Sequence, residues 1–298
     1  FRDSEGCCIV LGTRDCSVQW KDAKMVEIAP APNLSDGQLT KLYGFATAIF
    51  EELEYCGVGT VEFLVARDGN IYFLEVNPRL QVEHGVTELV TGIDLVEMQL
   101  RIAYGEALPI SQEDVVIDGY ALEARINAQR IDPGDPTNLV VTSGTVEEVK
   151  LPRGGNVRVD HAFVSGGTFN LEYNITQGKV MAKGHSYRRG IANLQSALKR
   201  TVIMGVETNI PLVLEILGDE EFRKGRHDTT FLPKLLRKLG STESVREYKG
   251  KELAAAIGAA IAVALPDQAP RPPTGALDFS YWRYSGRREG LRAPLKKR

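Results

Sequence analysis

The stretch GTVEFLVARDGNIYFLEVNPRLQVE, which occupies residues 59–83, decides the fold of this chain. Two runs of apolar and β-branched residues flank Asp68-Gly69, a dipeptide that favours a tight hairpin turn. A two-residue turn at this dipeptide places Glu62 directly opposite Glu75 on the neighbouring strand. Like charges that face each other destabilise a hairpin, so we interpret the pair as part of a site.

A divalent cation between the two carboxylates would relieve their repulsion. Asn77 lies two residues beyond Glu75, on the same face of the strand, and adds an amide oxygen. Two carboxylates and an amide oxygen suit magnesium or manganese, which keep water or phosphate oxygens as their other ligands. The sequence therefore predicts a metal site at Glu62, Glu75 and Asn77.

Polar side chains continue beyond this metal site with a period of two. Arg79, Gln81 and Glu83 alternate with apolar residues that can pack inward if the segment stays extended. Arg79 offers two parallel donors to a small oxyanion, and Glu83 can take the proton of that oxyanion. The alternative, an amphipathic strand with a solvated face, explains each residue singly. The whole series after an opposed glutamate pair favours a catalytic site.

The rest of the chain predicts an α+β fold. Ser35 and Gln38 form a capping box at the start of a helix that runs to Gly57. A second amphipathic helix covers 94–103. Further helices are expected at 188–204 and 211–217, and strands at 7–12, 59–66, 70–77, 120–126, 144–150 and 156–160.

Composition excludes several classes of partner. The 298 residues are 43% hydrophobic with a net charge of −3, so no positive field recruits nucleic acid or an anionic membrane. No apolar run reaches the roughly 20 residues of a membrane helix. The four cysteines lack a CxxC spacing, so we expect reduced thiols and a cytoplasmic, mitochondrial-matrix or plastid-stroma location.

Five motifs make the chain resemble the biotin carboxylase component of biotin-dependent carboxylases, which has an ATP-grasp fold. They are RDCSVQ (14–19), GVGTVEFL (57–64), FLEVNPRLQVEHGVTELVTGIDLVEMQLRIAYGE (73–106), GYALEARINA (119–128) and NVRVD (156–160). The resemblance implies three parts: the second, C-terminal half of an ATP-grasp domain (1–110), a β-rich biotin carboxylase C-terminal subdomain (111–240), and a helix with a Pro-rich linker toward a carboxyltransferase-binding or biotinyl region (241–298). It also implies a homo-oligomer that works with a biotin carboxyl carrier domain and a carboxyltransferase subunit.

The resemblance further implies a reaction and a role for each site residue. ATP and bicarbonate would give carboxyphosphate, and the carboxyl group would pass to biotin on a carrier, as in an acyl-CoA carboxylase α-subunit. The implied cofactors are ATP, Mg²⁺ or Mn²⁺ at Glu62, Glu75 and Asn77, and biotin that is not attached to this chain. Bicarbonate would bind to Arg79, Gln81, the Val82 backbone and Glu83, with Glu83 as the general base. Gln19 and Lys24 would bind ATP. Arg158 would hold the biotin ureido oxygen. From the residues alone, Lys24 reads as a surface lysine and Arg158 as an exposed strand arginine.

Departures from the family pattern leave two alternatives open. Asp22 replaces an ATP-contacting His, Val141-Thr-Ser-Gly144 replaces Pro-Ser-Pro-Gly, and Asn174-Ile175 replaces Asp-Ser. The family's N-terminal domain and glycine-rich lid are expected before residue 1. One alternative is therefore a structural subunit that keeps the fold without catalysis. The other is a different ATP-grasp ligase, such as a carbamoyl-phosphate synthetase, against which RLQVEH and VRVD point to biotin.

Overall fold

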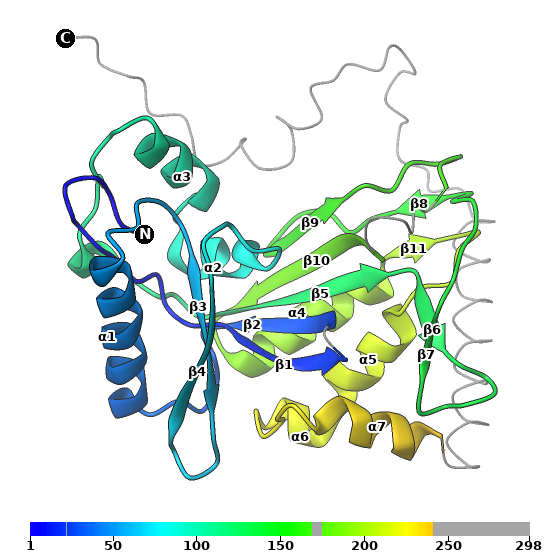
Figure 1. Cartoon of the computed structure of the whole chain (residues 1–298). Coiled ribbons are helices and arrows are strands. Elements are labelled where there is room, and N and C mark those ends of the chain that lie inside the picture. Colours follow the sequence, from blue (N-terminus) through cyan, green and yellow to red (C-terminus); the bar gives the residue numbers. More distant parts are fainter. Residues whose placement is uncertain (22, 169–174, 241–298) are drawn as a thin grey trace, which may run out of the picture.

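The computed structural model describes residues 1–21, 23–168 and 175–240 (Figure 1). A five-stranded antiparallel sheet with the order β1-β2-β5-β10-β9 forms its centre. These strands are β1 (Asp15–Trp20), β2 (Ala23–Ala29), β5 (Tyr120–Asn127), β9 (Val157–His161) and β10 (Thr176–Gly184). Three two-stranded antiparallel pairs accompany the sheet: β3 (Thr60–Val65) with β4 (Ile71–Asn77), β6 (Gln129–Ile131) with β7 (Leu139–Val141), and β8 (Val149–Lys150) with β11 (Val202–Ile203).

Helices cover both faces of the central sheet (Figure 1). Helices α2 (His84–Thr91) and α4 (Tyr187–Lys199) pack against it on opposite faces, while α5 (Ile210–Gly218) contacts β5 and α7 (Phe231–Leu239) contacts β1. The other helices are α1 (Asp36–Glu52), which contacts β3, α3 (Leu95–Ala103) and α6 (Glu220–Arg223), with a short 3₁₀ helix at Gln112–Asp114. Side chains alternate across each strand, so Leu122 and Val180 join the main core with α4, whereas Ala121 and Met181 pack against α2 on the other face. In the described part of the chain, no helix is long and apolar enough to cross a bilayer.

The strongest local signals of the sequence are confirmed. Ser35 accepts a hydrogen bond from the Gln38 backbone and completes the capping box of α1, although this helix ends at Glu52 rather than continuing to Gly57. Asp94 caps α3. The predicted strand at 7–12 is wrong, because this segment makes only an isolated bridge between Cys8 and Arg2.

Several elements were not expected from the sequence. These are β1, β2, β6, β7, β10, β11, α2, α6 and α7. The strand predicted over 144–150 is confined to β8, and the helix predicted over 188–204 ends at Lys199. Strand β2 pairs with β5 and with β1, so the first two predicted domains share one sheet across residue 110. The third predicted domain lies outside the described residues.

In the β3–β4 hairpin Glu62 faces Glu75 as predicted, but the turn that produces this pairing differs from the predicted one. Ala66 donates to the Asn70 carbonyl, which leaves a three-residue loop in which Gly69 adopts a φ of 88°. This loop shifts the register by one residue from the predicted two-residue turn, and a bulge at Leu74 shifts it back. Glu62 therefore lies opposite Glu75, as predicted.

Two glycines bring α4 close to the end of β10. A Cβ atom added at Gly184 would lie 2.3 Å from the backbone nitrogen of Gly190, and neither backbone can move aside cheaply. We expect Gly184→Ala to lower the free energy of unfolding by about 2 kcal/mol in urea denaturation. The control is Gly37→Ala in the first turn of α1, where a Cβ meets nothing within 4 Å and should stabilise slightly. Equal stabilities for the two variants would contradict this packing.

Candidate active site

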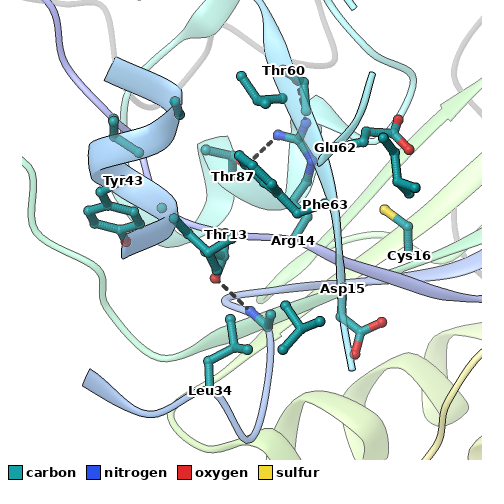
Figure 2. A pocket seen from close by; sticks show the side chains of 18 of the residues that line it. Thr13, Arg14, Asp15, Cys16, Leu34, Tyr43, Thr60, Glu62, Phe63 and Thr87 are labelled. Atoms are coloured by element: carbon teal, nitrogen blue, oxygen red, sulfur yellow. Dashed lines mark hydrogen bonds between the residues drawn. The ribbon is translucent and has the colours of Figure 1, made fainter. Parts of the chain in front are cut away.

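A cleft of about 720 Å³ separates the β3–β4 hairpin and α1 from the start of β1. Figure 2 shows Glu62 of β3 and Cys16 of β1 on its wall, with Arg14 reaching toward Thr60 and Thr87. Arg14 donates to the hydroxyls of these threonines at 2.9 and 3.0 Å. It also donates to Gln81 Oε1 at 2.7 Å, so it ties β3 and α2 to the segment before β1.

The predicted metal ligands converge at this wall. Glu62 Oε1 accepts hydrogen bonds from Asn77 Nδ2 at 3.2 Å and Gln81 Nε2 at 2.8 Å, and Glu75 Oε1 accepts from Asn77 Nδ2 at 2.8 Å. No group of three or more His, Cys, Asp or Glu side chains with metal-binding geometry occurs within the described ranges. The donor set is thus two opposed carboxylates and one amide, which fits a hard cation that takes its remaining ligands from phosphate or water.

Glu83 lies at the N-terminus of α2 and is only 2% exposed. Its Oε1 accepts from Lys24 Nζ at 2.8 Å, and its Oε2 accepts from Arg125 Nη2 at 2.9 Å. Lys24 Nζ also donates to Glu62 Oε1 at 2.9 Å. Lys24 therefore joins the predicted metal carboxylate to the predicted base, which no local pattern in the sequence indicated.

The electrostatic surroundings hold Glu83 in its charged form. Burial by itself would raise the pKa of Glu83, but the hydrogen bond from Lys24 and the charges of Lys24, Arg14 and Arg125 outweigh it and lower this pKa to about 2. Burial would lower the pKa of Lys24, but Cys16, Glu83 and Glu62 together raise it. Burial and the Glu83 charge raise the pKa of the Cys16 thiol, whose Sγ lies 3.7 Å from Glu83 Oε1. Glu83 is therefore an ionised carboxylate between two cations, Lys24 and Arg125.

The polar series after Glu75 does not continue as an extended strand. Strand β4 ends at Asn77, because Pro78 has no N–H for the ladder, and the chain then turns into α2. Arg79 stays exposed and donates to Asn77 Oδ1 at 3.3 Å. The Val82 carbonyl accepts from Lys179 Nζ. Gln81 therefore lines the cleft, Glu83 is buried beside it and Arg79 is exposed, without the predicted period of two.

Arg125 contacts Glu83, whereas Arg158 pairs with acidic side chains of α2 and β9. Arg158 donates to both oxygens of Asp160, at 3.0 and 2.9 Å, and to Glu88 Oε2 at 2.5 Å. Its side chain is 30% exposed, and it has no contact with Glu83. Arg125 lies within the motif at 119–128, and the buried character of β5 was the signal that could have marked it.

The remaining predicted site residue, Gln19, also lines the cleft and pairs with Lys24 across β1 and β2. Asp22, Tyr173 and Asn174 lie outside the described residues. Their departures from the family pattern stay sequence observations.

Two family models match the chain in succession. Residues 1–111 match the carbamoyl-phosphate synthase L chain ATP-binding domain, and residues 123–234 match the biotin carboxylase C-terminal domain. A 2-oxoglutarate carboxylase small subunit from Hydrogenobacter thermophilus is 39% identical over 77% of this chain and 48% of its own length. A biotin carboxylase from Pseudomonas aeruginosa is 40% identical over 78% of this chain and 51% of its own length. The chain thus spans about half the length of these relatives.

Solved structures agree with this likeness. The biotin carboxylase domain of the H. thermophilus 2-oxoglutarate carboxylase, crystallised with MgADP, ADP and bicarbonate, matches with a TM-score of 0.74 and 38% identity. The match covers 79% of this chain and 52% of that one. The biotin carboxylase subunit of a pyruvate carboxylase matches with the same TM-score, identity and coverage.

Proposed function

Because this chain belongs to the biotin carboxylase family, we propose that it supplies part of the active site of an ATP-dependent biotin carboxylase. The reaction would convert ATP and bicarbonate to carboxyphosphate and pass the carboxyl group to carrier-bound biotin. The observation that carries this proposal is the position of Lys24, which donates to both Glu62 and Glu83. One cation thus lies between a carboxylate suited to metal–phosphate binding and a buried base.

Glu62, Glu75 and Asn77 would hold magnesium or manganese, with Gln19 and Lys24 near the ATP phosphates. The metal, when bound, would neutralise phosphate charge. Lys24 is placed to stabilise the transferring group from the other side. The relatives crystallised with MgADP support this assignment by similarity.

Arg79, Gln81, the Val82 backbone and Glu83 would bind bicarbonate, with Glu83 accepting its proton. A carboxylate with a pKa of about 2 is a weak base, so the substrate must loosen one of the two cations that Glu83 contacts. Lys24 is the cation that can leave, because phosphate and carboxyphosphate oxygens are competing acceptors. Substrate binding would therefore raise the basicity of Glu83 at the step that needs it.

The biotin ureido oxygen needs a cation beside the base that removes the proton from its nitrogen. Arg158, which Glu88 and Asp160 hold on β9, would bind this oxygen. Arg125 contacts Glu83 at 2.9 Å and would hold the base in place. Among the described residues, no contact in the cleft specifically favours the alternative that the chain is a structural subunit.

The final carboxyl acceptor belongs to the carboxyltransferase, and we propose the acyl-CoA carboxylase type. A mitochondrial methylcrotonoyl-CoA carboxylase α-subunit from Oryza sativa is 38% identical over 89% of this chain and 35% of its own length. The corresponding partners are a biotin carboxyl carrier domain, a carboxyltransferase subunit and further copies of the chain. Four free thiols suit a reducing compartment such as the cytoplasm or an organelle matrix.

The proposed function predicts bicarbonate-dependent ATP cleavage together with transfer of labelled bicarbonate to biotin by the native assembly. Both activities should require Mg²⁺ or Mn²⁺ and stop when a chelator removes the metal. ATP cleavage that is indifferent to bicarbonate would indicate another ATP-grasp ligase. Absence of both activities in a folded assembly would favour the structural subunit.

A further inference from the structure

Two further carboxyl groups are buried behind Glu83. Glu27 and Glu123 are each 0% exposed, and the strand register places them directly opposite each other on β2 and β5. Glu27 Oε2 and both oxygens of Glu123 have no hydrogen-bond partner among the described residues. Two ionised carboxylates in such a position would repel each other strongly, because protein interiors screen charge poorly.

We propose that Glu27 and Glu123 together retain one proton at neutral pH and position Arg125 toward Glu83. Glu27 is the positioning residue, and Glu123 keeps the pair at a single negative charge. The inference rests on the proposed function, since it gives the buried pair a role in the basicity of Glu83. Neither residue contacts the predicted metal ligands or the cleft.

The cations that face the pair are shared with other acceptors. Arg125 Nε donates to Glu27 Oε1 at 2.5 Å while its Nη2 serves Glu83. Lys179 Nζ lies 3.8 Å from Glu123 Oε2 but also 3.6 Å from Asp160 Oδ2, and it donates to the Val82 carbonyl. Neither cation is therefore fully available to neutralise the pair.

The other charged or titratable groups around the pair divide into two sets. Lys24 and Cys16 lie on the far side of Glu83, and His84, Glu88 and Arg158 lie on the α2 and β9 side. Burial raises the pKa of Glu27 to about 7, and burial and the Glu27 charge raise the pKa of Glu123 well above its ordinary value. These directions agree with a proton held by Glu123.

The planar guanidinium explains how Glu27 would act on Glu83. When Glu27 fixes Nε, the direction of Nη2 is fixed as well, because the donors of arginine form a rigid fork. A neutral Glu123 leaves Glu27 charged without a second anion that would draw Arg125 away from Glu83. The pair would therefore keep Arg125 aligned toward Glu83.

Infrared difference spectroscopy of the native protein, with isotope-labelled glutamate, tests the proton directly. We expect a buried carboxylic acid C=O band at pH 7 that shifts in D₂O. It should disappear in Glu123→Gln, since Glu27 then ionises against Arg125 alone, and persist in the exposed control Glu106→Gln. No such band in the wild-type protein, or a band unchanged in Glu123→Gln and in Glu27→Gln, would overturn the proposal.

A kinetic measurement tests the positioning role. Glu27→Gln should lower kcat for bicarbonate-dependent ATP cleavage on the order of 100-fold with little change in the KM for ATP, as expected for a misaligned catalytic group. Glu27→Asp should restore part of kcat. An unchanged kcat in folded Glu27→Gln would refute positioning. If the wild-type assembly shows no such cleavage, the proposed function fails, whereas the infrared result still decides the shared proton.

Discussion

Glu83→Gln is expected to lower bicarbonate-dependent ATP cleavage by the native assembly at least about 100-fold, the usual effect of removing a general base. Gln keeps the size of Glu83, but it has one acceptor oxygen in place of two and cannot accept the bicarbonate proton. The two cations that contact Glu83, Lys24 and Arg125, would also lose their shared anion. The rate loss should therefore appear in kcat/KM for bicarbonate, measured by steady-state phosphate release.

The matched control for this variant is Glu97→Gln. Glu97 lies in the first turn of α3 and pairs with Arg101 on the surface, away from the cleft. Its replacement should leave the activity unchanged. An assembly that cleaves ATP normally with Glu83→Gln in place would remove the catalytic assignment and leave the structural-subunit alternative.

Arg125→Met is expected to lower the free energy of unfolding by about 3–5 kcal/mol, because it leaves buried anions without their cation. Arg125 bridges Glu27 at 2.5 Å and Glu83 at 2.9 Å, and its side chain is only 12% exposed. Met replaces most of the packing volume, so the loss reports the missing charge. Urea denaturation with an unchanged m-value would measure it.

Two other arginines serve as controls for this effect. Arg101→Met breaks exposed pairs with Glu97 and Glu106 and should change stability little, because water screens such pairs. Arg158→Met breaks the half-buried pairs with Glu88 and Asp160 and should give an intermediate loss. Equal losses for Arg125 and Arg101 would show that the buried network does not stabilise the fold.

Local chemistry made parts of this structure predictable. The capping box of α1 and the Asp94 cap of α3 involve residues three positions apart. The predicted pairing of Glu62 with Glu75 is correct although the loop has three residues, because the bulge at Leu74 reverses the register shift that this loop causes. By contrast, β10 contains Gly178 and Lys179 and carries no clear strand pattern, yet it lies between β5 and β9 at the centre of the sheet.

Sequence patterns alone predicted the α+β class, the resemblance to biotin carboxylases and the opposed Glu62–Glu75 pair. The contacts of Lys24 with Glu62 and Glu83, and of Arg125 with Glu83, emerged only from the folded chain. Sequence separation explains this difference. Caps and turns are set by neighbouring residues, whereas Lys24 and Arg125 reach Glu83 from 59 and 42 residues away. The pairing of β2 with β5 beneath α2 creates those contacts, and it is stabilised by burial that no local pattern records.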